Sequence, residues 1–170
     1  MKEKKERIFL IGFMASGKST IGKELAKELN YDFIDTDRFI EKEIGMTIPI
    51  IFEKFGEDFF RKKESEILIS IVTKKNVVIS VGGGLPCHNN NMSLLKKTGK
   101  VIFLKSGFEV YYERLQQMKD RPIANKLSPN ELKKLYTSRL PIYTQADFTI
   151  LSNRLIPLVV KRIIHLIFKK

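Results

Sequence analysis

Five short segments rich in Val, Ile, Leu and Phe alternate along the chain with longer stretches in which apolar residues recur every three or four positions. These segments cover residues 7–11, 31–35, 77–81, 100–105 and 147–151. The first is a compact run of bulky apolar residues, which is typical of a buried parallel strand. Short strands that alternate with helices predict an α/β fold, with a parallel sheet covered by helices on both faces.

The intervening stretches carry helix start and stop signals. We expect helices over residues 19–29, 38–44, 48–55, 57–73, 89–97, 107–117 and 155–169, and a further helix that begins at residue 128 and carries Arg139. Asn30 is a candidate C-terminal cap, and Gly56 breaks the pattern between two helices. The tetrapeptide Ser128-Pro129-Asn130-Glu131 is a capping box with proline at the first helical position.

Composition narrows the class of protein. The 170 residues suit a single domain over residues 1–170, and 43% hydrophobic with 29% charged residues is typical of a soluble globular protein. The single cysteine, Cys87, excludes an internal disulfide and fits a reducing cytosol. No signal-peptide region or membrane-length apolar run occurs. We expect a cytoplasmic protein without a membrane partner.

The net charge of +12 is compatible with nucleic acid, an anionic membrane surface or small acidic substrates. The basic residues are spread along the chain, and neither an RNA-binding aromatic motif nor a helix-turn-helix signature occurs. We therefore favour a solvated surface that attracts small anions such as ATP, and expect no nucleic-acid partner.

Residues 12–19 read Gly-Phe-Met-Ala-Ser-Gly-Lys-Ser and fit the pattern G-x-x-x-x-G-K-[ST]. A predicted strand precedes them and a predicted helix follows, which is the context that this motif requires. Gly12 and Gly17 allow backbone N–H groups to approach a polyphosphate, and the helix N-terminus adds a positive dipole end. Lys18 would reach the terminal phosphates, and the Ser19 hydroxyl would ligate Mg²⁺. The segment predicts a nucleotide-phosphate site.

Asp35-Thr36-Asp37 ends the second predicted strand. Ligands bind beyond the carboxyl ends of strands in open α/β sheets, and the spacing allows one carboxylate to face Mg²⁺ and the other a substrate hydroxyl. The alternative is a helix cap, in which Thr36 or Asp37 caps the helix over 38–44. Because the segment follows a phosphate loop, we favour the site.

Further candidates lie between residues 48 and 84. Apolar residues around Phe52 recur at three- and four-residue intervals, which usually means core packing, although Phe52 and Phe60 are candidates for the wall of a substrate pocket. The residues with this spacing are Ile48, Ile51, Phe52, Phe55 and Phe59. Arg61 has Glu64 three residues on, and a surface ion pair remains an alternative to a binding role. Gly82-Gly83-Gly84 follows the third strand and either exposes backbone N–H groups to a ligand or forms a flexible turn.

A polar stretch that begins at Lys119-Asp120-Arg121-Pro122 is a candidate lid over the nucleotide, covering about residues 115–128. Arg139 lies in the helix that follows it.

Taken together, these motifs resemble the shikimate kinase family over nearly the whole chain and in the same order. The resemblance implies transfer of the ATP γ-phosphoryl group to the 3-hydroxyl of shikimate, with Mg²⁺ as cofactor. It also implies a three-layer P-loop kinase fold with a five-stranded parallel sheet in the order 2-3-1-4-5. We expect a monomer.

The resemblance also implies a role for each matching residue. Asp37 would bind the reacting hydroxyl and act as base, and Lys18 and Arg121 would contact the transferring phosphoryl group. Ser19 and Asp35 would form the metal site. The implied ATP-binding residues are Gly12, Ala15, Ser16, Gly17, Lys18, Ser19, Thr20, Arg114, Arg121 and Asn153. The implied shikimate-binding residues are Asp37, Phe52, Phe60, Arg61, Gly82, Gly83, Gly84 and Arg139.

Two other hypotheses remain open. A gluconate-type sugar-acid kinase would share the phosphate loop and the acidic strand end, but the glycine triplet and the Arg61/Arg139 pair argue against it. A P-loop regulator or a nucleic-acid-binding module is suggested by the charge of +12.

Overall fold

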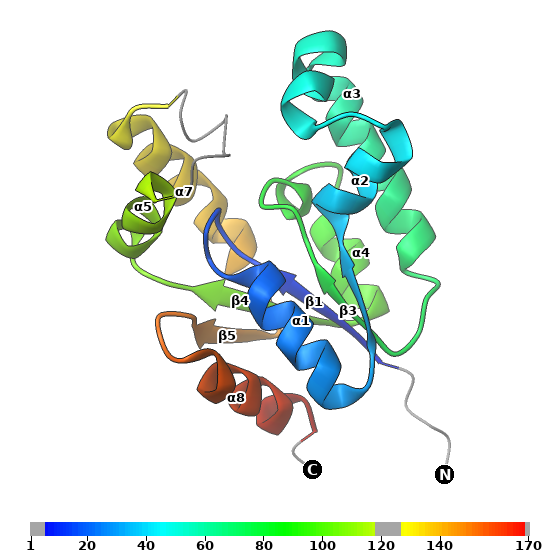
Figure 1. The fold of residues 1–170 in the computed structure, drawn as a ribbon, viewed down its shortest axis with the longest axis vertical. Coiled ribbons are helices and arrows are strands. Elements are labelled where there is room, and N and C mark those ends of the chain that lie inside the picture. Colours follow the sequence, from blue (N-terminus) through cyan, green and yellow to red (C-terminus); the bar gives the residue numbers. More distant parts are fainter. Residues whose placement is uncertain (1–5, 118–126, 169–170) are drawn as a thin grey trace.

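The computed structural model describes residues 6–117 and 127–168 of the chain. Its strands are β1 (Arg7–Ile11), β2 (Asp32–Asp35), β3 (Val77–Ser80), β4 (Lys100–Lys105) and β5 (Phe148–Leu151). Its helices are α1 (Lys18–Leu29), α2 (Thr36–Ile44), α3 (Ile48–Ile71), the 3₁₀ helix η1 (Leu85–Cys87), α4 (Asn91–Thr98), α5 (Phe108–Gln116), α7 (Pro129–Tyr143) and α8 (Ile156–Phe168). Strands and helices follow one another in the predicted order, with η1 added (Figure 1).

The strands form one parallel sheet in the order β2-β3-β1-β4-β5, which confirms the predicted fold class. β1 lies at the centre, where Leu10 pairs with Ser80 of β3 and with Ile102 of β4. Parallel neighbours need crossover connections, which here are helices. The loop after β1 therefore lies in the middle of the carboxyl edge of the sheet, where open α/β sheets bind ligands.

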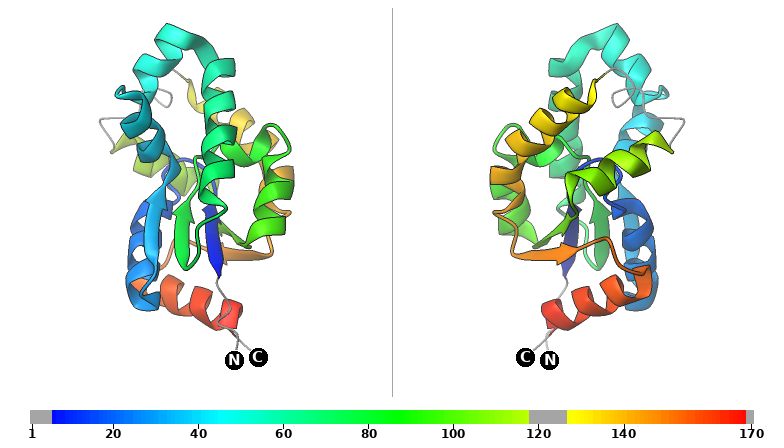
Figure 2. Two further views of the ribbon diagram at one scale, coloured as in Figure 1. Left: turned by 90° about the vertical axis from the view of Figure 1, so that its right-hand side faces the viewer. Right: turned by 90° about the vertical axis from the view of Figure 1, so that its left-hand side faces the viewer.

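Successive residues of the central strand point to opposite faces of the sheet and divide the core into two layers. Ile8 and Leu10 pack with α1 and α8, whereas Phe9 and Ile11 belong to a larger cluster that includes α2, α3, α4, α5 and α7. Figure 2 shows α1 and α4 on opposite sides of the sheet. The larger layer supports the elements that carry the candidate site.

Two helix boundaries bear on that site. α2 begins at Thr36, two residues earlier than predicted, because the Asp35 carboxylate accepts hydrogen bonds from the backbone N–H groups of Asp37 and Arg38. The alternative weighed from the sequence, a cap at Thr36 or Asp37, was therefore wrong in its residue, because Asp35 is the cap. The predicted break at Gly56 is confirmed, since this residue has φ 80° and ψ 175° within α3.

The last helix packs on the sheet, with Val159, Val160 and Ile163 buried in the same cluster as Ile8 and Leu10. Within residues 6–117 and 127–168, no helix combines the length and the apolar character needed to cross a membrane.

Candidate active site

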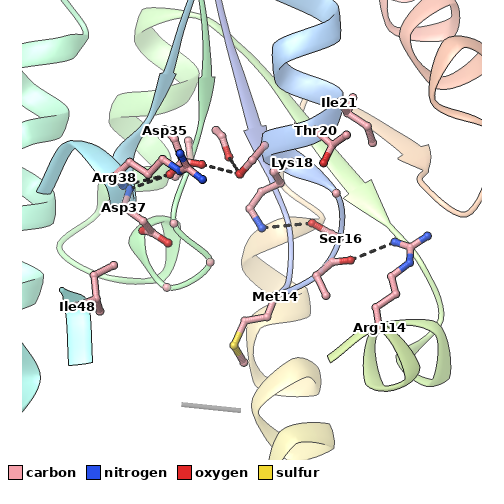
Figure 3. A pocket seen from close by; sticks show the side chains of 18 of the residues that line it. Met14, Ser16, Lys18, Thr20, Ile21, Asp35, Asp37, Arg38, Ile48 and Arg114 are labelled. Carbon is pink, nitrogen blue, oxygen red and sulfur yellow. Dashed lines mark hydrogen bonds between the residues drawn. The ribbon is translucent and has the colours of Figure 1, made fainter. Parts of the chain in front are cut away.

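A cavity of about 960 Å³ lies at the carboxyl edge of the sheet, where β1, β2 and β3 end. Its lining includes the loop after β1, Asp35 and Asp37 at the end of β2, the loop Gly82–Gly84 after β3, and side chains from α3, α5 and α7. Figure 3 shows Lys18, Asp37 and Arg114, from three separate elements, around a common space. Motifs that are far apart in the sequence therefore share one cavity.

The phosphate loop, residues 12–17, has backbone geometry that depends on its glycines. Gly12 and Gly17 have φ of 148° and 89°, and a Cβ at Gly12 would lie 2.8 Å from the carbonyl oxygen of Leu104. Ala15 also has a positive φ of 57°, a conformation that costs a non-glycine residue about 1–2 kcal/mol. The loop forms a cradle at the N-terminus of α1, which is suited to an anion.

Lys18 opens α1 and folds back over this loop. Its Nζ donates hydrogen bonds to the carbonyl oxygens of Gly12 at 3.0 Å and Phe13 at 2.8 Å, and to Ser16 Oγ at 3.3 Å. The ammonium group therefore lies at the positive end of the α1 dipole. Of the residues predicted to bind phosphate, Ala15, Ser16, Gly17, Lys18, Ser19 and Thr20 line the cavity, whereas Gly12 lies outside the lining and shapes the loop.

Ser19 and Asp35 come together at the side of the cavity nearest β3. The Ser19 hydroxyl donates a hydrogen bond of 2.5 Å to Asp35 Oδ2, and Ser80 Oγ lies 3.4 Å from Ser19 Oγ (Figure 3). Asp35 Oδ1 accepts from the backbone N–H of Asp37 at 3.1 Å. Asp35 thus caps α2 and also lines the cavity, so one carboxylate combines a capping contact with a position in the candidate site.

Hydroxyl and carboxylate oxygens are the donors that Mg²⁺ prefers, and Mg²⁺ is commonly held by one or two protein groups together with substrate phosphates. Within the described parts of the chain, no three or more His, Cys, Asp or Glu side chains group closely enough to hold a metal ion. The donor set of Ser19 and Asp35 fits such a partial Mg²⁺ site.

Asp37 lies in the first turn of α2 and faces the loop Gly82–Gly84, hereafter the glycine loop. A Cβ at Gly82 would collide with a carboxylate oxygen of Asp37, and a Cβ at Gly84 would collide with the guanidinium of Arg61. One alternative from the sequence was that the glycines expose their backbone N–H groups to a ligand. This does not hold for Gly82, because its N–H donates a hydrogen bond of 2.8 Å to Thr36 Oγ1. The glycines are therefore needed for close approach of neighbouring side chains.

Arg61 and Glu64 form a buried ion pair, with a distance of 2.8 Å between Nη1 and Oε2 and only 2% exposure of the Glu64 side chain. The alternative of a surface pair was therefore wrong. Burial raises the pKa of Glu64 to about 7 against the opposing effect of Arg61. Burial alone would lower the pKa of Arg61, but the carboxylates of Glu64 and Glu57 outweigh it and raise this pKa, so the guanidinium stays charged.

Phe52 and Phe60 satisfy both interpretations, core packing and the wall of a pocket. Their ring centroids are 4.7 Å apart, Phe60 is buried in the core cluster, and both rings line the cavity. The Arg61 guanidinium carbon lies 5.4 Å from the Phe60 centroid and 6.0 Å from that of Phe52. The aromatic wall therefore also supports the arginine by a cation–π contact.

Arg139 reaches the same part of the cavity from α7. Its guanidinium carbon lies 5.9 Å from the Phe13 ring centroid, and Nη1 would lie 3.4 Å from a Cβ placed on Gly83. Arg61 and Arg139 thus approach the glycine loop from α3 and α7. The fold brings these two predicted binding residues together although they lie 78 positions apart in the sequence.

Arg114 of α5 marks the opposite end of the cavity. Its guanidinium donates to the carbonyl oxygens of Ala15 at 3.1 Å and Ser152 at 3.3 Å. It therefore joins the phosphate loop to the segment after β5, which contains Asn153, one of the ATP-binding residues that the family resemblance implies. Ser152 and Arg154 line the cavity there, while Asn153 is exposed and outside the lining, so its contact with ATP stays a prediction.

Glu64 and Tyr143 are among the residues near the cavity that were not selected from the sequence as site residues. Glu64 lines the cavity, and Tyr143 donates to the carbonyl oxygen of Gly83 at 2.6 Å. The available signals were the spacing of Glu64 from Arg61 and of Tyr143 from Arg139, which place each pair on one helix face. The predicted lid centre, including Arg121, lies outside the described residues.

Comparison with known proteins gives a consistent picture. A family model described as shikimate kinase matches residues 14–168. The chain is similar to the shikimate kinase of Aquifex aeolicus, with 44% identity over 158 residues that cover 93% of this chain and 94% of that protein. It is also similar to the structure of the Acinetobacter baumannii shikimate kinase in complex with shikimate, with a TM-score of 0.92, 36% identity, and coverage of 97% and 94% of the two chains.

A more distant similarity bears on the sugar-acid kinase alternative. A gluconokinase from Sinorhizobium meliloti has a TM-score of 0.61 and 18% identity, with coverage of 92% of this chain and 87% of that one. At this level of identity the likeness extends to the fold alone.

Proposed function

The chain belongs to the shikimate kinase family, and we propose how its residues transfer the γ-phosphoryl group of ATP to the 3-hydroxyl group of shikimate. The observation that carries the proposal is the convergence of a phosphate loop, an acidic strand end and two arginines on one cavity. Phosphoryl transfer asks a protein chiefly to position the two substrates and to neutralise negative charge. Each group in the cavity suits one of these tasks.

The donor half of the cavity is the phosphate loop with α1. Backbone N–H groups at the start of α1 and the Lys18 ammonium would hold the ATP phosphates. Lys18 is already fixed over the loop by the carbonyl oxygens of Gly12 and Phe13. The adenine would lie at the end of the cavity where Arg114 joins the loop to the segment after β5.

The acceptor half is formed by Asp37, the glycine loop, Arg61 and Arg139. A guanidinium presents a planar fork that matches a carboxylate, so the two arginines would bind the carboxylate of shikimate. Asp37, beside Gly82, would accept the hydrogen bond and the proton of the 3-hydroxyl group. The rings of Phe52 and Phe60 line the cavity and would cover the apolar side of the ring.

Ser19 and Asp35 would hold Mg²⁺ on the donor side of the cavity. The bound ion would neutralise charge on the phosphates and orient them. Arg121 would reach the transferring phosphoryl group from the lid, a role that follows from the family resemblance. As a working form of the enzyme we propose a monomer built as one kinase domain.

Release of ADP by purified protein, measured in a coupled assay with ATP and Mg²⁺, tests this function. Shikimate should stimulate release strongly, whereas gluconate should not. Lys18→Ala should abolish the stimulation with little change in thermal stability, because Lys18 lies outside the core. The same variant is the control for a contaminating kinase, whose activity would persist in it. Stimulation by gluconate instead of shikimate, or by neither, would contradict the assignment.

A further inference from the structure

The glycine loop has no side chains with which to anchor itself, yet its position decides how closely functional groups approach. A Cβ on Gly82 would collide with Asp37, and a Cβ on Gly84 would collide with Arg61. A small shift of this backbone would therefore move the acceptor site relative to α2 and α3. Something outside the loop must hold it in place.

Thr36 holds the first side of the loop. Its Oγ1 accepts a hydrogen bond of 2.8 Å from the Gly82 N–H, and the residue is fully buried. Thr36 separates Asp35 from Asp37, and both carboxylates line the cavity whereas Thr36 does not. The threonine therefore ties the first turn of α2, which carries Asp37, to the glycine loop.

Tyr143 holds the second side. Its hydroxyl donates a hydrogen bond of 2.6 Å to the carbonyl oxygen of Gly83. The side chain is fully buried, with its ring centroid 5.2 Å from that of Phe103. Burial raises the pKa of Tyr143 above its ordinary value, so the hydroxyl keeps its proton and remains a donor. Since Tyr143 follows Arg139 by one helical turn, this contact ties the arginine-bearing end of α7 to the loop.

We propose that Thr36 and Tyr143 are positioning residues that clamp the glycine loop from two sides and thereby set the acceptor geometry of Asp37 and Arg139. The inference deepens the proposed function and rests on it, because it assigns the clamp to binding of the acceptor substrate. Neither residue lines the cavity. Removal of either partner leaves a backbone group of the loop to find another hydrogen bond, and the loop shifts as it does so.

The test uses substitutions that keep shape and remove one hydrogen bond. Thr36→Val removes the acceptor while Thr36→Ser retains it, and Tyr143→Phe removes the donor while its ring stays in place. At saturating ATP, Thr36→Val and Tyr143→Phe should each lower kcat/KM for shikimate about tenfold, with the KM for ATP unchanged. Thr36→Ser should restore the wild-type value. Hydrogen exchange of residues 81–85 should rise in both defective variants.

Tyr136→Phe is the matched control, because Tyr136 lies on the same helix and its hydroxyl donates to the carbonyl oxygen of Ser106 at 3.2 Å. It should leave kcat/KM for shikimate unchanged. The clamp is overturned if Thr36→Val and Tyr143→Phe keep wild-type kcat/KM for shikimate, or if both raise the KM for ATP equally. If Thr36→Val does not fold, Tyr143→Phe alone decides. Absence of shikimate turnover by the wild-type protein would overturn the proposed function itself.

Discussion

At the scale of single residues, Asp35 and Asp37 have different surroundings although only Thr36 separates them. Asp35 accepts from the Ser19 hydroxyl and caps α2. Asp37 lies one position inside the helix, beside Gly82. Because the strand passes directly into the helix, the two carboxylates line the same cavity at different places, Asp35 beside Ser19 and Asp37 beside Gly82.

Asparagine substitutions separate the two roles. Asp35→Asn should keep the fold, since asparagine caps a helix as well as aspartate does. Its loss of activity, about 10–100-fold, should ease as Mg²⁺ is raised. Asp37→Asn should lower kcat about 10²–10⁴-fold without any response to Mg²⁺, because it removes the base. The measurement is kcat against Mg²⁺ concentration for both variants. Rescue of Asp37→Asn but not of Asp35→Asn would show that the assignment is reversed.

Glu64 is a buried carboxyl that charged groups surround on three helices: Arg61 on its own α3, Asp37 on α2 and Arg139 on α7. Its pKa is raised to about 7, with burial as the main cause and Arg61 opposing it. The unfolded chain releases this proton near pH 4.5, whereas the folded protein keeps it until about pH 7. The contribution of Glu64 to stability is therefore fully present below pH 4.5 and is lost as pH rises toward 7.

Chemical unfolding of the wild type and Glu64→Gln between pH 4 and 8 checks this sign. The free energy of unfolding of the wild type minus that of Glu64→Gln should fall between about pH 4.5 and pH 7 and then level off. Glu66→Gln, an exposed position on the same helix that pairs with Lys63, is the control and should show no such fall. A difference that rises over this interval would mean that the pKa of Glu64 is lowered by Arg61 instead.

At the scale of secondary structure, two glycines with positive φ bracket the first half of α3. Gly45 has φ 73° and ψ 20°, whereas Gly56 has φ 80° and ψ 175°. A Cβ at either position would meet no atom within 4 Å, so backbone conformation alone decides what each position tolerates. The Gly45 conformation is the left-handed helical one that asparagine also adopts, while that of Gly56 is essentially restricted to glycine.

Asparagine at each glycine tests this difference. Gly56→Asn should lower the free energy of unfolding by about 1–3 kcal/mol. It should also raise the KM for shikimate, because Gly56 is the helix break that separates Phe52 from Arg61. Gly45→Asn, the matched control, should lower stability less and should leave the KM for shikimate close to that of the wild type. Urea unfolding and steady-state kinetics measure both. Equal losses of stability in the two variants would show that the helix break at Gly56 does not require a conformation restricted to glycine.

At the scale of the whole molecule, the charge of +12 acts together with the concentration of cationic groups in one cavity. Lys18, Arg61, Arg114 and Arg139 all line it. An excess of positive charge attracts anionic substrates over a distance that salt shortens. A protein whose positive surface serves small anions needs no extended contact with nucleic acid.

Binding of a short DNA duplex at several salt concentrations tests this interpretation. Binding should be weak at physiological salt and should fall steeply as salt rises, because contacts with phosphates alone release counterions. Phosphorylation of shikimate should continue when the duplex is added at physiological salt. Tight binding that persists at high salt would revive the hypothesis of a nucleic-acid-binding module.

The sequence by itself determined the order of strands and helices, the break at Gly56, the cap at Asn30 and the phosphate loop. These features depend on local properties: apolar periodicity, the conformational range of glycine, and capping side chains a few residues from the groups that they satisfy. The family resemblance added the strand order, which the structure confirms.

Only the tertiary structure decided which side chains of the site meet. The spacing of Arg61 and Glu64 is the same for a surface pair and for a buried one. Neighbouring elements bury this pair, and burial is what raises the pKa of Glu64 above its ordinary value. The contacts of Thr36 with Gly82 and of Tyr143 with Gly83 join residues 46 and 60 positions apart. No local pattern encodes such contacts, because they arise when parallel pairing brings the ends of β2 and β3 together and when α7 packs against the glycine loop that follows β3.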